Sequence, residues 1–137
     1  MTVESQGTAG AERRAQLLRG SLDLCVLAAL EQQPGHAYEL AARLAEAGLG
    51  EVSYGSVYPL ITRLRRAGLL AEQKQPSPLG PARTVFSLTD AGRAALGEWL
   101  TQWQRSTAEV EAVLRATGAW SGAWPGARTG AQTGEPR

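Results

Sequence analysis

Three arginine side chains and no carboxylate lie between Ser53 and Leu70. Guanidinium groups bind phosphate oxygens and the edges of guanine bases, so nucleic-acid contact is the chemistry that this segment could perform. Its apolar residues recur at helical spacing, which places Arg63 and Arg66 together on the opposite, outer side. That side begins with small residues and ends with basic ones. Such a face predicts a helix whose backbone can come close to a broad polyanion.

Pro59 stands in the second turn of this predicted helix. A proline inside a helix normally costs ~3 kcal/mol, because it lacks an N–H and its ring crowds the carbonyl four residues earlier. That earlier residue is Gly55, whose backbone can move aside. Pro59 lies on the outer side, so a kink there would leave the core side undisturbed. Ser53 is the predicted N-cap.

Apolar spacing predicts two helices before the arginine-bearing one, over residues 16–32 and 36–47. After it, residues 69–75 and 82–88 form short extended runs on either side of a turn-rich tip, which predicts a β-hairpin. Three helices followed by a hairpin is the order of a winged helix-turn-helix. In that fold the third helix enters the DNA major groove and the hairpin reaches the neighbouring backbone. We therefore predict a mainly α fold with a small β-hairpin and a long C-terminal helix.

The C-terminal helix is predicted to begin at Asp90, with Thr89 as its N-cap. Two rows of apolar residues along it predict an a/d seam broken only by Thr107. The residues expected in this seam are Leu96, Leu100, Trp103, Val110 and Leu114. A lone helix would leave this stripe exposed, whereas pairing with a second copy would bury it, so we expect a homodimer.

Positive charge is concentrated in one part of the chain. Residues 53–84 carry five basic residues against Glu72, whereas residues 1–52 carry four basic and seven acidic residues. A clustered positive charge favours a polyanionic partner, here double-stranded DNA. The chain has no serine–histidine–carboxylate set and no phosphate-binding glycine loop, so we do not expect an enzyme.

The rest of the composition excludes other classes of site. With Cys25 as the one cysteine and His36 as the one histidine, neither a disulfide within the chain nor the usual zinc ligand set is available. We expect no metal and no cofactor, and assign both residues structural roles. No run of eighteen apolar residues and no secretory signal occur, so we expect no membrane partner and a cytoplasmic location.

Three stretches of the sequence, taken in order, resemble the PadR family of transcriptional regulators. They are "GSLDLCVLAALEQQPGHAYEL", "SYGSVYPLITRLRRAGLL" and "ARTVFSLTDAGR". The resemblance extends over residues 17–114. It implies a homodimeric repressor with one C-terminal dimerisation helix, as in the short branch of the family. An inverted-repeat operator would then present two half-sites roughly 34 Å apart.

The resemblance also implies a site for an effector. Some members of the family hold flat ligands between aromatic side chains of their dimerisation helices. In this chain the aromatic residues at that place are Trp99 and Trp103, so a small aromatic effector is the ligand to expect. Tryptophan at heptad spacing also fits a dimer core, and both interpretations stay open.

Some positions depart from the family pattern. Arg65 replaces an acidic residue, which makes the helix more basic and would strengthen phosphate contact. Phe86 stands where the family usually has tyrosine, so we do not expect a wing hydrogen bond from a hydroxyl at that position.

These considerations divide the chain into four parts. Residues 1–12 are expected to form a flexible tail, residues 13–88 the winged helix, residues 89–116 the dimerisation helix and residues 117–137 a disordered tail. The expected DNA-binding residues are Ser53, Tyr54, Gly55, Ser56, Tyr58, Pro59, Thr62, Arg63, Arg66, Lys74 and Arg83. Tyr58 stands at the edge of the core, where it could contact a phosphate or cap the core.

One alternative to a DNA-binding repressor remains. A winged helix can serve as a protein-interaction module without DNA, since fold alone does not decide function. A protein-binding face should be apolar or mixed in charge, whereas residues 53–84 are predominantly positive. The charge therefore favours DNA.

Overall fold

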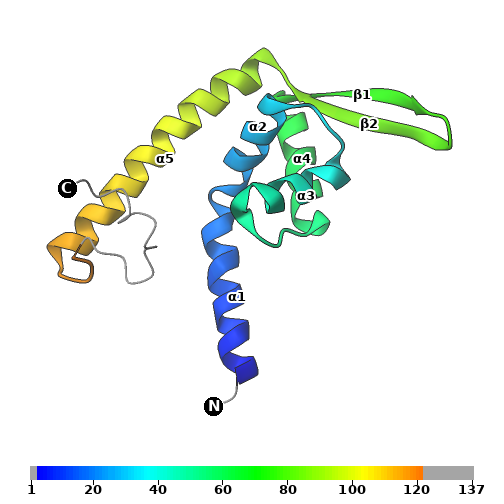
Figure 1. Ribbon diagram of the computed structural model, residues 1–137. Helices are drawn as coiled ribbons and strands as arrows, with labels where there is room; N and C mark the ends of the chain where they lie inside the picture. Colours follow the sequence, from blue (N-terminus) through cyan, green and yellow to red (C-terminus); the bar gives the residue numbers. More distant parts are fainter. Residues whose placement is uncertain (1–2, 122–137) are drawn as a thin grey trace, which may run out of the picture. The chain divides into compact units, whose positions relative to one another are not determined.

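The computed structural model describes residues 3–121 of the chain, with side chains from residue 8 onward (Figure 1). Its elements, in order, are α1 (Val3–Arg19), α2 (Leu22–Gln32), α3 (Ala37–Leu44), a π-helical turn (Ala45–Leu49), α4 (Tyr54–Arg66), β1 (Leu70–Ser77), β2 (Gly80–Leu88) and α5 (Asp90–Ala116). The mainly α fold with a two-stranded antiparallel hairpin confirms the predicted fold class. The chain divides into two compact units, Met1–Leu100 and Thr101–Arg137, and each is described by itself.

The core of the first unit lies among α2, α3 and α4 and is closed by the root of the hairpin. Buried side chains recur along each helix at the predicted spacing. They include Val26, Leu27 and Leu30 of α2, Leu40 and Leu44 of α3, Val57, Leu60, Ile61 and Leu64 of α4, and Leu70, Phe86 and Leu88 of the hairpin. The hairpin extends away from these helices (Figure 1), so its outer part is left exposed for contact with other molecules.

The N-terminal region differs from the expectation. A flexible tail was expected over residues 1–12 and one helix over residues 16–32, whereas α1 already begins at Val3 and ends at Arg19. Residues 11–19 are rich in alanine, glutamine, arginine and leucine, which are strong helix formers even without an apolar stripe. The break before α2 falls at Gly20 and Ser21, where glycine disfavours helix continuation.

The joint between α4 and the hairpin uses a glycine. Gly68 adopts φ 82°, its N–H donates to the Arg65 carbonyl, and the N–H of Leu69 donates to the Leu64 carbonyl. This is a Schellman motif, which ends the helix and turns the chain into β1.

The start of α5 is attached to the same joint. The Thr89 hydroxyl donates to the Gly68 carbonyl at 2.7 Å and accepts from the Gly92 N–H at 3.0 Å. Thr89 is therefore the N-cap that the sequence predicted. A Cβ at position 92 would lie 2.1 Å from the Leu69 carbonyl oxygen, so only glycine allows α5 to approach β1 this closely.

The root of β2 is bonded on both sides. β1 pairs with it in antiparallel register, with Glu72 opposite Phe86. On the other side, Phe86 exchanges two backbone hydrogen bonds with Gly35, at 2.8 and 3.1 Å. The loop between α2 and α3 therefore fixes the position of the hairpin relative to the helices.

The described part of the second unit is the C-terminal part of α5 and a turn over residues 117–121. The backbone N–H of Trp120 donates to the Leu114 carbonyl at 3.1 Å, and the Arg115 guanidinium lies 4.9 Å from the centre of the Trp120 ring. Residues 117–121 thus form an ordered end to the helix where a disordered tail was expected from residue 117. The rest of that expected tail, residues 122–137, lies outside the described residues.

Candidate nucleic-acid interface

The outer face of α4 is built as the sequence predicted. The Ser53 hydroxyl accepts from the Ser56 N–H at 3.1 Å, which confirms Ser53 as the N-cap. Pro59 is accommodated inside a continuous helix that runs from Tyr54 to Arg66. Gly55, Ser56 and Pro59 are exposed, so the first turns of this face carry little side-chain bulk. A helix with such a face can bring its backbone close to base edges.

The basic end of the face is also exposed. Arg63 and Arg66 are both accessible, and neither forms an ion pair with any residue whose side chain the structure describes. Thr62, which precedes Arg63, is half-buried. Two guanidinium groups without a carboxylate partner remain able to bind phosphate or guanine.

Arg65 behaves differently from its neighbours. Its Nε lies 3.4 Å from Oε1 of Glu72 on β1, with both side chains partly exposed. The sequence suggested that Arg65 would strengthen phosphate contact, but the structure pairs it with the hairpin. Arg65 thus helps to orient the hairpin against α4.

Three tyrosine rings form a row along one side of α4. Tyr54 and Tyr58 stack with ring centres 5.5 Å apart, and Tyr38 of α3 meets Tyr54 at 5.7 Å. Their exposed fractions are 78% for Tyr38, 43% for Tyr54 and 48% for Tyr58. Tyr58 is thus half-exposed, and its ring stacks on a surface ring. Tyr38 was not among the predicted site residues, although it lies near the N-terminus of α3 and within a stretch that resembles the family.

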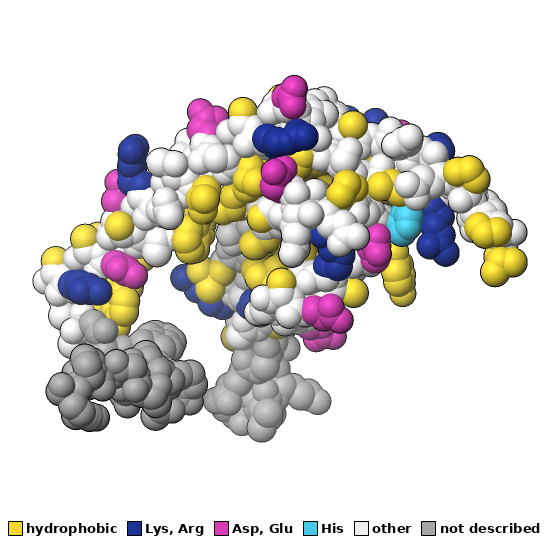
Figure 2. Space-filling model, turned by 45° about the horizontal axis from the view of Figure 1, so that its top comes forward, with side chains coloured by type: hydrophobic (Ala, Val, Ile, Leu, Met, Phe, Trp, Pro, Cys, Tyr) yellow, Lys and Arg dark blue, Asp and Glu magenta, His cyan; other side chains and the backbone are white. Residues whose placement is uncertain are grey.

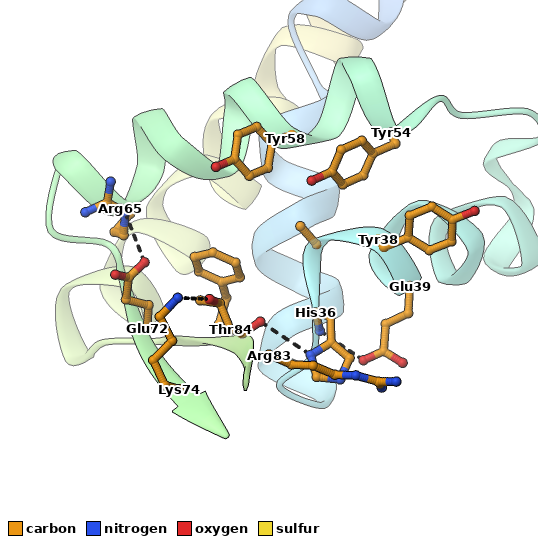
Figure 3. A pocket seen from close by; sticks show the side chains of 12 residues that line it. His36, Tyr38, Glu39, Tyr54, Tyr58, Arg65, Glu72, Lys74, Arg83 and Thr84 are labelled. Atoms are coloured by element: carbon orange, nitrogen blue, oxygen red, sulfur yellow. Dashed lines mark hydrogen bonds and ion pairs between the residues drawn. The ribbon is translucent and has the colours of Figure 1, made fainter. Parts of the chain in front are cut away.

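This row borders a groove of about 780 Å³ between α4, the start of α3 and the hairpin (Figure 3). From the hairpin, Lys74 and Arg83 line it, and the Lys74 ammonium donates to the Thr84 hydroxyl at 2.9 Å. Two carboxylates, Glu39 and Glu72, line it as well. The charge of this groove is therefore mixed.

His36 fixes the groove at its base, as expected of a structural residue. Its Nδ1 lies 3.3 Å from the Thr84 carbonyl oxygen, and its backbone N–H donates to Glu39 Oε1 at 2.9 Å. The histidine joins the start of α3 to β2. In the space-filling view it is visible at the surface, with acidic, basic and hydrophobic side chains around it (Figure 2).

The other side of α4 faces α1. A second groove, of about 590 Å³, is lined from α4 by Ser56, Pro59 and Arg63, and it extends to Ser53 before the helix. Most of the predicted DNA-binding residues therefore line one or the other of the two grooves beside α4. Tyr54, Tyr58, Lys74 and Arg83 line the groove on the hairpin side, and Ser53, Ser56, Pro59 and Arg63 line the groove on the α1 side. Gly55, Thr62 and Arg66 line neither groove.

The predicted seam on α5 is largely exposed. Leu100, Trp103, Val110 and Leu114 are accessible, whereas Leu96 is half-buried against the core of the first unit. Thr107, the polar interruption, donates its hydroxyl to the Trp103 carbonyl at 2.8 Å, so its polar group is satisfied within the helix. The use of this seam in a dimer stays a prediction.

The two tryptophans assigned to a ligand lie in different surroundings. Trp99 is half-buried and packs against the core of the first unit. Trp103 has an exposed fraction of 47%. Of the pair, Trp103 offers the larger free ring surface for stacking.

Other kinds of site find little support in the described part of the chain. Residues 3–121 contain no group of three or more histidine, cysteine or acidic side chains able to hold a metal ion. No helix among them is long and apolar enough to cross a membrane. Burial, together with the nearby carboxylate of Asp23, raises the pKa of the Cys25 thiol, so the thiolate is disfavoured.

Comparison with known proteins gives consistent results. Residues 26–98, more than half of the chain, match the model of the transcriptional regulator PadR-like family. The chain is 34% identical to a PadR-like transcriptional regulator from Bacillus cereus, over 73% of this chain and 97% of that one, with a TM-score of 0.63. It is 28% identical to a PadR family regulator from Eggerthella lenta, over 82% and 97%, with a TM-score of 0.73.

A third solved structure is Bacillus subtilis PadR in complex with operator DNA. It is 21% identical, over 58% of this chain and 46% of that chain, with a TM-score of 0.53. At this identity the likeness concerns the fold alone. No match was found among curated proteins.

Proposed function

Because the chain belongs to the PadR-like family of transcriptional regulators, we propose that it is a homodimeric repressor that binds an inverted-repeat operator through α4 and the wing formed by β1 and β2. The observation that carries this proposal is the outer face of α4. It combines a low first half, at Gly55, Ser56 and Pro59, with exposed Arg63 and Arg66. This is the shape and charge that a major groove accepts.

A relative of the same fold supports the role of DNA as partner. Bacillus subtilis PadR, whose fold is similar, has been solved in complex with operator DNA. In this chain α4, with the predicted DNA-binding residues on and beside it, would enter the groove. Lys74 and Arg83 on the wing would contact phosphates. Residues 13–88 would then be the DNA-binding part, acting in the cytoplasm where the chromosome lies.

The exposed stripe on α5 supports the dimer in this proposal. Leu100, Trp103, Val110 and Leu114 leave apolar surface on residues 89–116 that a second copy could cover. A two-fold pair of α4 helices would match a palindromic operator. A small aromatic effector that stacks on Trp103 would release the operator by altering this pairing.

A gel-shift titration on the DNA upstream of its own gene tests the function. The titration runs at two salt concentrations, with a scrambled duplex as the control. Tight binding that prefers the upstream DNA and weakens with salt is the expected result. Equal binding to both duplexes would contradict a specific operator in the upstream DNA. Absence of binding to either would favour the protein-interaction module instead.

A further inference from the structure

Helix α1 carries a cluster of positive charge that the family match does not include. The matched region begins at residue 26, whereas α1 ends at Arg19. Residues 8–19, the part of α1 whose side chains the structure describes, contain Arg13, Arg14 and Arg19 against one carboxylate, Glu12. The charge of this helix therefore needs its own explanation.

Contacts with α2 and with the π-helical turn hold α1 in the first unit, across a groove from α4. The Arg14 guanidinium donates from Nη2 to the Leu49 carbonyl, which follows α3 by one π-helical turn. Leu18 is half-buried, and together with Ala11 and Ala15 it lines the α1 side of the groove that faces α4. Arg14 thus acts as a tether, and α1 and α4 face each other across this groove.

The groove between these helices is basic. Arg14 and Arg19 line it from α1 and Arg63 lines it from α4, while Glu51 is the only carboxylate among the lining residues. Arg19 forms no ion pair with any residue whose side chain the structure describes. Its charge is therefore available to an anion that approaches from outside.

A duplex bound by α4 would bring such an anion. When a helix lies in the major groove, the two phosphate backbones run along its two sides. The wing borders α4 on one side, and α1 borders it on the other, since the α1 groove shares Pro59 and Arg63 with the outer face of α4. The element on the α1 side would consequently meet the second backbone.

We infer that α1 is a second border of the DNA-binding surface, in which Arg19 contacts a phosphate of the backbone opposite the wing. This inference rests on the proposed function and adds a contact that lies before the matched family region. Phosphate contacts carry no sequence information, so Arg19 would contribute affinity and salt dependence and leave operator preference unchanged.

The test compares the salt dependence of DNA binding by full-length variants. Arg19→Ala should reduce the slope of log K against log salt by about one, equally on operator and scrambled DNA. Arg13→Ala is the matched control, since Arg13 belongs to the same helix but does not line the groove, and its guanidinium donates to Gln16 at 3.3 Å. We expect the wild-type slope from this control.

A lysine variant separates charge from structure. Arg19→Lys keeps a positive charge at the same position, so it should retain the wild-type slope. Circular dichroism of all variants verifies that α1 stays helical. An unchanged slope in Arg19→Ala, or a loss in Arg19→Lys as large as that in Arg19→Ala, would overturn the inference.

The outcomes also separate this inference from the proposed function. If Arg63→Ala weakens binding while Arg19→Ala leaves the slope unchanged, the function stands and the α1 contact fails. If the wild-type protein binds neither duplex, both fail.

Discussion

The two sides of α4 differ in how their charged groups are engaged. On the wing side, Arg65 pairs with Glu72 and Lys74 donates to Thr84, so these side chains are held in place by neighbours. On the α1 side, Arg19 and Arg63 form no ion pair within the described side chains. On the wing side two basic side chains are therefore held by neighbours. On the α1 side Arg14 is held by its bond to the Leu49 carbonyl, while Arg19 and Arg63 offer free charge. The held side chains favour a fixed orientation of the wing, and the free charges favour affinity for any phosphate.

The largest effect on operator affinity is expected from preventing dimerisation, because a monomer would present one α4 helix with its two borders instead of two. Replacing both Leu100 and Leu114 with Asp places charges in the predicted seam, so the chain should become monomeric. A monomer contacts one half-site, and operator affinity should fall about a thousandfold or more, toward non-specific binding. Light scattering measures the mass and gel shift the affinity. A dimer that survives the double substitution would show that the seam lies elsewhere.

The next largest effect concerns the centre of the α4 face. Arg63→Ala and Arg66→Ala should each weaken operator binding by ~1–3 kcal/mol if the side chain reads a base. Arg66 lines neither groove, whereas Arg63 lines the α1 groove, so we expect Arg66→Ala to lower operator preference more. Competition between operator and scrambled DNA measures this difference. Arg105→Ala, an exposed arginine on α5, is the matched control. Unchanged affinity in both variants would contradict the proposed contact between α4 and DNA.

Tyr58 tests whether the aromatic row belongs to the DNA-binding surface. Tyr58→Phe keeps the stacked ring and removes only the hydroxyl. We expect a loss of ~1 kcal/mol in DNA affinity, the typical contribution of one hydrogen bond, with the melting temperature unchanged. Isothermal titration and thermal melts give the two quantities. A drop in melting temperature without a change in affinity would assign Tyr58 to capping the core.

The smallest effect is expected at the Arg65–Glu72 pair. Glu72→Gln removes a partly exposed ion pair, which should change the free energy of unfolding by less than about 0.5 kcal/mol. It also frees Arg65 and removes a carboxylate from the wing-side groove, so DNA affinity should rise slightly and its salt slope should steepen. Urea unfolding and salt titration measure both effects. A weaker DNA affinity would mean that the role of the Arg65–Glu72 pair in positioning the wing outweighs the repulsion between the Glu72 carboxylate and DNA.

The local sequence pattern was sufficient to predict the helices and hairpin of the winged helix, but not the contacts of α1, which borders it. The helical spacing of Val57, Leu60 and Leu64 predicts α4. Thr89 predicts the start of α5, because threonine can cap a helix. Helix α1 has no such pattern, since the residues that line its α4-facing groove are two alanines, two arginines and a single leucine, Leu18. Its tether joins Arg14 to a carbonyl 35 residues away, which no local rule can predict.

The aromatic row was missed for a related reason. Tyr38 and Tyr54 belong to different helices, and their rings meet only after the core has set the packing of α3 on α4. Similarly, the pairing of Arg65 with Glu72 depends on the turn at Gly68 that sends β1 back past α4. Residues that act within one element were predicted, whereas those whose role depends on two elements were found only in the structure.

The double bonding of Phe86 has a consequence for motion. Its amide is buried in a bond to Gly35 while the opposite side of β2 is closed by β1, so it should exchange with solvent deuterium only when the whole unit unfolds. Amides near the tip, around the fully exposed Leu79, should exchange through local fraying instead. The wing would then swing about a fixed root, and its tip could follow a DNA backbone without disturbing α4, the helix proposed to read the bases.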